Sequence, residues 1–359
     1  MKYIDEYRNQ ELVKAIADRL KRISKKEIIL MEVCGGHTMA IHRFGLNSLL
    51  PPNIRLISGP GCPVCVSSQR FIDTAIACSR VPDSILATYG DLMRVPGTSS
   101  SLDNERAKGK DIRVIYSVLE AVEIARQNPE KIIIFPGIGF ETTTPATSAA
   151  ILKAFSERIS NFRVLSAHKV MPPVMKALVD EDIKINGFIA PGHVSTVAGT
   201  TMYDDLALNY GLGVVVSGFE PSDIMQSVLM LAEQIEKDSP KVEVQYTRVV
   251  EKEGNSVALK LMYEVFEYRD DEWRGFGTIP ESGLQIKKEY SDFNAENELG
   301  QEVPESAEPK GCICGQILRG IKTPSDCRLF GKECRPSDPV GACMVSSEGI
   351  CSTYYRYRS

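Results

Sequence analysis

Ten cysteines occupy two separate parts of this sequence of 359 residues. One group lies in the first quarter of the chain, the other lies in the last fifty residues, and the long segment between them has none. Thiols bind metal ions, exchange disulfides and act as nucleophiles, so such groups are candidates for chemistry. The cysteines are Cys34, Cys62, Cys65, Cys78, Cys312, Cys314, Cys327, Cys334, Cys343 and Cys351.

The expected location of this chain is the cytoplasm, where purely structural disulfides are rare. The N-terminal segment is charged throughout and lacks the apolar core of a secretion signal. Apolar residues make up 43% of the chain, charged residues 25%, and the net charge is -5. No apolar run reaches the roughly 20 residues that cross a bilayer, and no dense Lys/Arg cluster is present, so neither a membrane nor nucleic acid is an expected partner.

The segment EVCGGHT (residues 32–38) places a thiol where a predicted strand gives way to a predicted helix. At a helix N-terminus, the Cys34 thiol feels the positive end of the helix dipole, which favours the thiolate and suits a soft metal ligand or a nucleophile. His37 follows within one turn and is a second candidate. The alternative is a buried structural cysteine whose neighbouring glycines only serve the turn.

The segment GPGCPVC (residues 59–65) contains a C-x-x-C pair after a second apolar run. This spacing lets Cys62 and Cys65 share a metal ion or close into a disulfide, and Pro63 restricts the backbone between them, as in thiol-exchange loops. Half of a structural zinc site is the alternative, but the sequence has no second C-x-x-C to complete it. We therefore favour a redox-active or metal-assembling pair.

Six cysteines crowd residues 312–351, a segment that contains no histidine. An all-thiolate set fits an iron–sulfur cluster or structural zinc. The wide, irregular spacing of these cysteines is unlike the short paired knuckles of zinc ribbons. The sequence therefore favours a [4Fe–4S] cluster on four of the six, with structural zinc as the alternative.

Two further polar loops follow predicted strands. GFETTTP (residues 139–145) supplies Glu141 and a run of threonines suited to lining a site for small hydrogen-bonding ligands, and PGHVS (residues 191–195) supplies His193. The first loop lacks the glycine spacing of a nucleotide-binding fingerprint. A hydrogen-bonded turn residue is the alternative for His193, and Cys78, on a helical stretch, is expected in the core.

Seven β-branched runs alternate with helical patterns from residue 28 onward. Continuous apolar runs of this kind are typical of parallel strands covered by helices on both faces, which predicts an α/β fold. Because ligands bind at the carboxyl ends of such strands, the loops that carry the candidate residues are expected to face one cleft. The predicted strands are residues 28–33, 54–58, 84–88, 132–135, 162–167, 185–190 and 212–218.

The predicted architecture consists of two doubly wound parallel-sheet lobes facing that cleft, plus a C-terminal iron–sulfur domain. The first lobe is assigned to residues 1–127, the second to residues 128–240 and the C-terminal region to residues 241–359. An Asn-Pro step near residue 128 marks the boundary between the lobes. The sequence after about residue 270 is loop-rich and acidic until the cysteines begin.

Five motifs together carry a resemblance to a known family. EVCGGHT, SGPGCPVCV, GFETTTP, PGHVS and GACMVSSEGIC occur in this order, and with them the chain resembles the HypD family of [NiFe] hydrogenase maturation proteins. The resemblance implies a redox-active assembly scaffold that works with a HypC-like small chaperone. On this scaffold an iron atom becomes Fe(CN)2CO, with a HypE-like protein as the cyanide donor, before transfer to the hydrogenase large subunit.

The resemblance also assigns roles to individual residues. It implies that Cys34 is a ligand of the mononuclear iron and that Cys62 and Cys65 form a redox-active pair beside it. Three further side chains are implied to position the iron and its ligands, namely His37, Glu141 and His193.

A C-terminal [4Fe–4S] cluster is implied as well, and we assign its ligands to Cys314, Cys327, Cys334 and Cys351. This leaves Cys312 and Cys343 to pair. Electrons for cleaving the carbon–sulfur bond of a thiocyanate are expected to pass from the cluster to the dithiol, so the tail must fold back against the first lobe. The alternative function is an iron–sulfur-dependent thiol–disulfide oxidoreductase resembling ferredoxin:thioredoxin reductase, for which Cys34 is dispensable.

Overall fold

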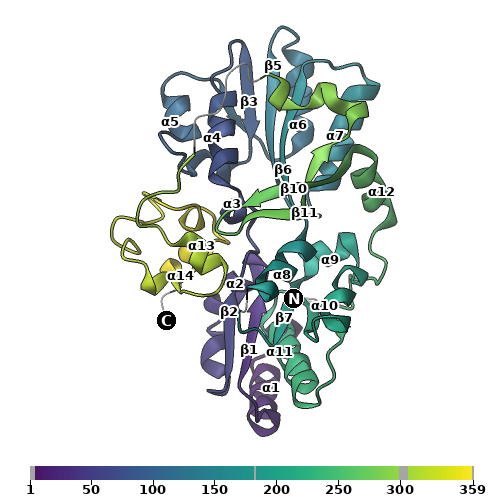
Figure 1. Cartoon of the computed structure of the whole chain (residues 1–359), viewed down its shortest axis with the longest axis vertical. Helices are drawn as coiled ribbons and strands as arrows, with labels where there is room; N and C mark the ends of the chain where they lie inside the picture. The colour runs from purple at the N-terminus through teal and green to yellow at the C-terminus, as the bar shows by residue number, and fades with distance from the viewer. Residues whose placement is uncertain (1–4, 182, 299–305, 358–359) are drawn as a thin grey trace.

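Two parallel β-sheets form the framework of the molecule, as a computed structural model of the chain shows (Figure 1). The structure describes residues 5–181, 183–298 and 306–357. One sheet has the strand order β2-β1-β7-β8-β9 and the other has the order β4-β3-β5-β6. The strands of the first sheet are β1 (Ile28–Glu32), β2 (Ile54–Ser58), β7 (Gly187–Pro191), β8 (Gly213–Ser217) and β9 (Val242–Val244). Those of the second sheet are β3 (Ser84–Thr88), β4 (Ile112–Val114), β5 (Ile132–Gly139) and β6 (Phe162–His168).

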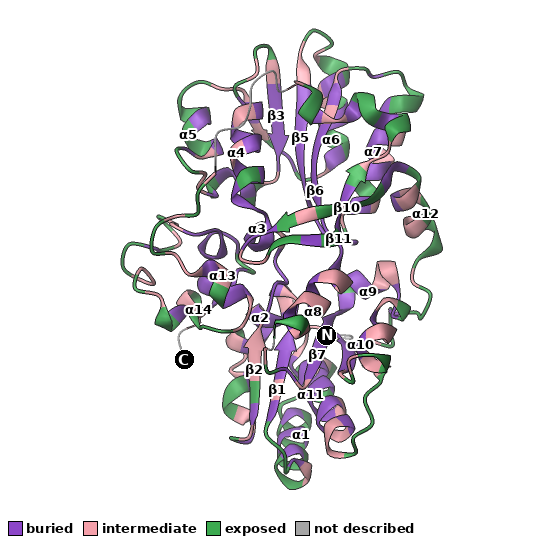
Figure 2. Ribbon diagram, in the orientation of Figure 1, coloured by how far each residue is buried: buried purple, intermediate pink, exposed green. Residues whose placement is uncertain are grey.

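The central strands are buried on both faces, as their continuous apolar sequences predict (Figure 2). In β8, Val214 and Val216 pack into one hydrophobic core, whereas Val215 between them packs into another. Each sheet is therefore covered by helices on both sides, and the predicted α/β class is confirmed.

The chain starts the first sheet, builds the second and then returns to the first. Strands β1 and β2 precede the second sheet in sequence, whereas β7, β8 and β9 follow it. Strands β3 and β5 pair directly in parallel, with Ile85 opposite Ile133, although residue 127 lies between them in the sequence. The predicted lobes of residues 1–127 and 128–240 therefore do not coincide with the two sheets, because the pairing of distant strands leaves no local trace in the sequence.

Helices of ordinary length connect and cover these strands. Helix α1 begins at an Asn9 cap, whose side chain accepts the amide N–H groups of Glu11 and Leu12, and it packs against α11. Among the described helices, none is long and apolar enough to cross a bilayer. The helices are α1 (Gln10–Ile23), α2 (Gly35–Arg43), α3 (Pro63–Val66), α4 (Gln69–Cys78), α5 (Leu102–Ala107), α6 (Val118–Gln127), α7 (Thr144–Ser156), α8 (Met171–Asp180), α9 (Gly192–Ala198), α10 (Asp204–Leu208), α11 (Pro221–Glu236), α12 (Ser256–Val265), α13 (Cys314–Leu318) and α14 (Ile350–Arg356). Short 3-10 turns occur at Asp5–Arg8, Leu46–Leu49, Gly90–Arg94, Thr201–Tyr203, Lys288–Phe293, Ala295–Glu298, Pro324–Asp326 and Ala342–Met344.

An antiparallel hairpin lies between the two parallel sheets, in a part of the chain for which the sequence predicted loops (Figure 1). It consists of β10 (Phe266–Trp273) and β11 (Gly277–Ile286). Most residues of β10 are polar and only its two end residues are buried, so it lacks the apolar alternation that identifies a strand in sequence. Isolated bridges join Ser67 to Trp273 and Lys169 to Gly283, which attach the hairpin to the residues directly after α3 and β6.

The C-terminal segment folds back beside α2 and α3, as the expected electron path from the tail to the C-x-x-C pair requires (Figure 1). Helix α14 packs against α2, and the turn Ala342–Met344 packs against α3. The last cysteines therefore reach the helices that carry the first ones.

Candidate functional site

Cys34 lies at the end of β1 and is the N-cap residue of α2, as predicted. The amide N–H groups of Gly36 and His37 point at its thiol, but burial and the nearby Glu348 and Glu32 outweigh them and raise the pKa of Cys34 to about 12. The expectation of a thiolate near neutral pH is therefore wrong for the free site. A soft metal ion can displace the thiol proton, so Cys34 remains suited to metal binding.

The buried carboxyl of Glu32, which the sequence analysis missed, fixes the backbone at Cys34. Its Oε2 accepts the Cys34 amide N–H at 3.1 Å, and its Oε1 accepts the Thr38 hydroxyl at 2.5 Å. Burial raises the pKa of Glu32 to about 8. Both ends of the turn between β1 and α2 are thus held by one side chain.

Gly61 allows the C-x-x-C loop to lie directly against Cys34. A Cβ at this position would stand 2.2 Å from the Cys34 nitrogen, and the amide N–H of Gly35 donates to the Gly61 carbonyl at 3.2 Å. Because Gly61 has no side chain, the two backbone segments can pack directly against each other. Cys62 is the residue that follows this contact with Cys34.

Cys62 is the N-cap residue of α3, and Cys65 lies within this helix. Both side chains are buried and both are free thiols. The Cys65 thiol lies within hydrogen-bonding reach of Cys343 and of Cys62, and burial and these neighbours raise its pKa well above the ordinary value. The C-x-x-C pair is therefore close enough to exchange with a third thiol.

Phe219 is sandwiched between the two candidate histidines. Its ring centroid lies 4.8 Å from that of His37 and 4.1 Å from that of His193, and both pairs are stacked. The His37 Nε2–H donates to the Gly218 carbonyl at 3.0 Å, while Nδ1 has no partner among the described residues. Burial lowers the pKa of His37 to about 4, so its imidazole is neutral at pH 7.

A cavity of about 590 Å³ opens between the lobes beside Cys34. Loops at the carboxyl ends of strands from both sheets line it, as expected for an α/β cleft. Cys34, His193 and Thr142 belong to the lining, whereas Thr143 and Thr144, the other threonines of the GFETTTP loop, do not. Further lining residues that the sequence analysis missed include Arg8, Phe219, Tyr246, Arg248 and Glu348.

Glu141 and His37 lie behind this cavity wall, since neither belongs to its lining. The Glu141 side chain is 3% exposed, its Oε1 accepts the Met171 amide at 3.0 Å, and its Oε2 has no partner among the described residues. Burial raises the pKa of Glu141 to about 7. The carboxyl therefore changes its charge near neutral pH.

Five C-terminal cysteines surround a small cavity of about 10 Å³ beside α13 and α14. The rest of the lining is apolar apart from Gly341, so sulfur is the only strong ligand type present, as thiolate ligation of a cluster requires. In the described part of the chain, no group of three or more His, Cys, Asp or Glu side chains is already arranged to hold a metal ion. The five cysteines are Cys312, Cys314, Cys327, Cys334 and Cys351.

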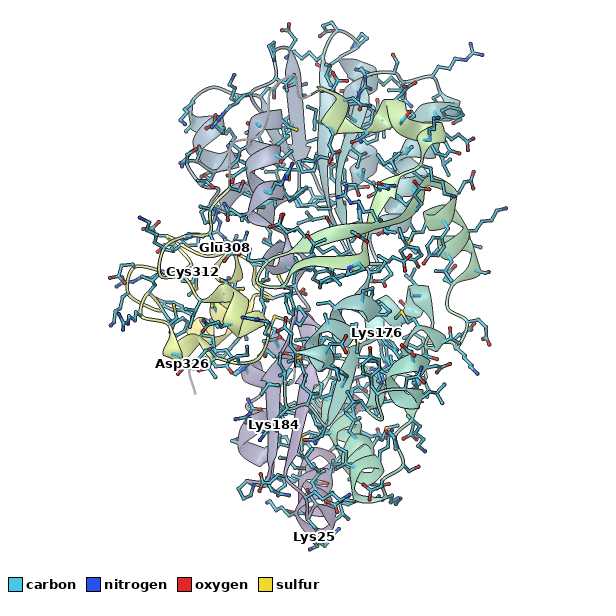
Figure 3. All side chains as sticks on the ribbon, in the orientation of Figure 1. Lys25, Lys176, Lys184, Glu308, Cys312 and Asp326 are labelled. Atoms are coloured by element: carbon cyan, nitrogen blue, oxygen red, sulfur yellow. The ribbon has the colours of Figure 1, made fainter. Side chains whose placement is uncertain are left out.

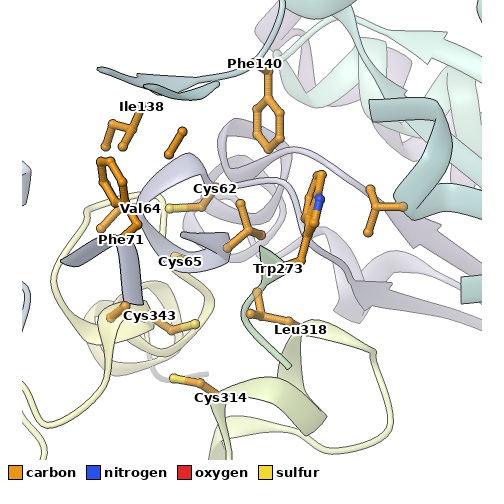
Figure 4. Close-up of a cluster of buried hydrophobic side chains, with 14 of the residues drawn as sticks. Cys62, Val64, Cys65, Phe71, Ile138, Phe140, Trp273, Cys314, Leu318 and Cys343 are labelled. Carbon is orange, nitrogen blue, oxygen red and sulfur yellow. The ribbon is translucent and has the colours of Figure 1, made fainter. Parts of the chain in front are cut away.

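Cys343 connects this cavity to the C-x-x-C pair (Figure 4). Its thiol lies within hydrogen-bonding reach of Cys314, Cys351 and Cys65, and these neighbours lower its pKa. Cys312 contacts Cys314 instead. Cys343 was expected to pair with Cys312, but its thiol contacts are with other cysteines. Neighbouring sulfur atoms connect Cys62 to Cys314 by way of Cys65 and Cys343.

The remaining candidates have structural roles. Cys78 is fully buried in α4, as predicted. Phe219 lies in the loop SGFEP after β8, so the rule that ligands bind at the carboxyl ends of such strands would have included it.

Comparisons with known proteins cover nearly the whole chain. Residues 8–358 match the family model HypD, described as "Hydrogenase formation hypA family". The hydrogenase maturation factor HypD of Rhizobium leguminosarum bv. viciae is 45% identical over 368 residues, which are 99% of this chain and 96% of that protein. The protein of the same name from Rhodobacter capsulatus is 44% identical over 372 residues, which are 99% of this chain and 98% of that one. That of Azotobacter vinelandii is 44% identical over 367 residues, covering 99% and 97%.

Proposed function

Because this chain belongs to the HypD family of hydrogenase formation proteins, we propose that it is the scaffold on which iron becomes Fe(CN)2CO during [NiFe] hydrogenase maturation. The observation that carries the proposal is the contact between the Cys34 turn and the C-x-x-C loop at Gly61, on the wall of an open cavity. A metal ligand and a dithiol reductant thus share one site. A HypC-like small chaperone contributes the second sulfur ligand, and the finished iron moves on to the hydrogenase large subunit.

Iron is the substrate of this site, and Cys34 holds it. Soft thiolate donors tolerate cyanide and carbon monoxide on the same iron. His193 lines the same cavity as Cys34 and orients what binds there. The neutral His37, whose Nδ1 has no partner among the described residues, stacks on Phe219 from behind the cavity wall and holds that ring against His193.

Cys62 and Cys65 supply the electrons for cyanide transfer. A thiocyanate on a HypE-like donor is cleaved when its carbon–sulfur bond takes up two electrons, which releases cyanide to iron and a thiolate to the donor. The two electrons come from the dithiol, which becomes the Cys62–Cys65 disulfide, and its two protons pass to the donor thiolate and to solvent. Where Cys314 is not a cluster ligand, Cys343 then attacks Cys65, the sulfur it contacts, and releases Cys62 as a thiolate. Cys314 attacks the Cys343–Cys65 mixed disulfide in turn, which returns the C-x-x-C pair to the dithiol and leaves a Cys314–Cys343 disulfide.

The cysteines of the C-terminal cavity would hold the proposed [4Fe–4S] cluster, which would supply electrons one at a time when bound. The ligands assigned from the sequence are Cys314, Cys327, Cys334 and Cys351. The contact of Cys314 with Cys343 favours a second set, in which Cys312 replaces Cys314 and the Cys314–Cys343 pair stays free for exchange.

Alanine variants distinguish the two ligand sets. The first set expects Cys314→Ala to lose the cluster, as judged by iron and sulfide content and by electron paramagnetic resonance (EPR), while Cys312→Ala keeps it. The second set expects the reverse. Cys78→Ala, which removes a buried thiol outside the cavity, is the matched control and must keep the cluster.

The thiol–disulfide oxidoreductase remains the second candidate because the Cys65–Cys343 contact suits it equally well. Purification with the HypC-like partner separates the two. Our proposal expects iron beyond the cluster content in wild-type protein and its loss from Cys34→Ala with the cluster retained. Unchanged iron in Cys34→Ala, together with undiminished reduction of a partner disulfide, would establish the oxidoreductase.

A further inference from the structure

Arg274 lies in the turn of the β10–β11 hairpin, wedged between the C-x-x-C helix and the C-terminal cysteines. Its amide N–H donates to the carbonyl of Val66, the last residue of α3, at 2.9 Å. The next residue, Gly275, touches Gly315, which follows Cys314, so closely that a Cβ on Gly275 would lie 2.2 Å from the Gly315 Cα. The turn therefore places Arg274 between the two groups of thiols.

The guanidinium of Arg274 is buried with little negative charge around it. The residue is 3% exposed, its Nε donates to the Ser67 carbonyl at 3.1 Å and its Nη1 donates to the Gln69 Oε1 at 3.1 Å. The one ion pair recorded for it among the described residues is with Glu308, at 3.7 Å, and that carboxylate is 43% exposed. Its Nη2 has no partner among the described residues.

A buried cation with neutral acceptors and one distant, partly hydrated carboxylate is costly unless another anion lies nearby. Glu308, whose carboxylate pairs with the Arg274 Nη1, precedes Cys312 of the cavity lining by four residues. Figure 3 shows Glu308 and Cys312 close together in the same C-terminal segment. The charge of Arg274 therefore lies beside the cysteine cavity, because Gly275 touches Gly315, the residue after Cys314.

We propose that Arg274 supplies the positive charge that balances the thiolate-bound cluster and raises its reduction potential, an inference that rests on the proposed function. A thiolate-ligated cluster is anionic, and one electron from a low-potential donor makes it more so. A fixed buried cation stabilises the reduced form more than the oxidised form, since Coulomb energies are large where solvent is excluded. Arg274 is thus a positioning residue that acts through charge on the electron path to Cys62 and Cys65.

The test is a dithionite titration of the anaerobically purified full-length protein, followed by EPR at controlled potential. Arg274→Met should shift the one-electron equilibrium at least tenfold toward the oxidised cluster, which is about 59 mV more negative. Arg274→Lys keeps the charge and should shift it less. Glu308→Gln removes the opposing charge and should move the potential in the positive direction, by a smaller amount because Glu308 is partly exposed.

Gln69→Met is the matched control, because it removes the hydrogen bond to Arg274 but keeps the positive charge, and its potential should equal that of the wild type. An unchanged potential in a cluster-loaded Arg274→Met protein would overturn the inference alone. If Arg274→Met loses the cluster, the reduction potentials of Arg274→Lys and Glu308→Gln test the inference instead. Wild-type potentials in both of these variants would overturn the inference. Wild-type protein without iron and sulfide overturns the proposed cofactor together with this inference.

Discussion

The thiol of Cys65 contacts the thiol of Cys343, so the two cysteine groups of the sequence meet at one pair of sulfur atoms. Cys65 belongs to α3, and Cys343 lies in the turn Ala342–Met344 that packs on this helix. Disulfide exchange requires the attacking sulfur to reach the disulfide. Under the proposed function, this contact is where electrons from the C-terminal cavity would enter the C-x-x-C pair.

Replacing Cys343 with serine tests this contact. We expect Cys343→Ser to keep its fold, but the oxidised Cys62–Cys65 pair should be reduced at least tenfold more slowly by dithionite, because the exchanging sulfur is missing. The rate is measured by maleimide labelling and peptide mass spectrometry. Cys78→Ala should behave as the wild type, and a wild-type rate in Cys343→Ser would show that electrons reach the pair by another path.

The close approach at Gly61 predicts a steep cost for one methyl group. Gly61→Ala forces its Cβ against the Cys34 backbone, and such overpacking should lower the free energy of unfolding by about 1–3 kcal/mol. Denaturant unfolding measures the cost. At Gly90 an added Cβ has its nearest contact 3.7 Å away, so Gly90→Ala is the control. Equal stability of both variants would mean that the loop and Cys34 are not in tight contact.

Local sequence patterns predicted most strands, because a strand buried on both faces needs apolar side chains at successive positions. Strand β8 is such a case, since all five of its residues are buried. The sheet to which each strand belongs was not predictable in the same way. Strand β7 pairs with β1 although all strands of the second sheet lie between them in the sequence. The hairpin was missed because β10 carries charged residues on its exposed side and gains its order from contacts at its ends, such as the one between Ser67 and Trp273.

The buried carboxyl of Glu141 predicts a pH dependence of stability. Its pKa is about 7 in the folded protein and about 4.3 in an unfolded chain. The folded state therefore binds the proton more tightly, so this contribution to stability is present in full below about pH 4 and is lost as the pH rises through 7. At pH 8 the loss is on the order of 3 kcal/mol, since one pKa unit corresponds to about 1.4 kcal/mol.

Glu141→Gln removes this titration but keeps an oxygen that accepts the Met171 amide. The variant should be more stable than the wild type at pH 8 and close to it at pH 5, as measured by urea unfolding. A difference between the two proteins that stays constant from pH 5 to pH 8 would contradict the raised pKa.

The candidate site was predictable where a motif names its own chemistry and less so where distant segments meet. The C-x-x-C pair and the cysteine-rich tail stand out from spacing alone, but the contact of Cys343 with Cys65 depends on the tertiary fold. The predicted charge state of Cys34 was wrong because the sequence indicates the helix N-terminus but not the burial of the thiol or the proximity of Glu348, which raise its pKa. Phe219 became a candidate only through the rings that it contacts, and Arg274 only through the contact of its neighbour Gly275 with Gly315.

The most direct test of iron assembly at Cys34 is infrared spectroscopy of anaerobically purified protein, co-expressed with its HypC-like chaperone and the cyanide donor. We expect stretching bands of iron-bound cyanide and carbon monoxide in the wild type. The same bands should be absent from Cys34→Ala, although its cluster signal in EPR is retained. Cyanide and carbonyl bands of undiminished intensity in Cys34→Ala, or their absence from a cluster-containing wild type, would contradict the account.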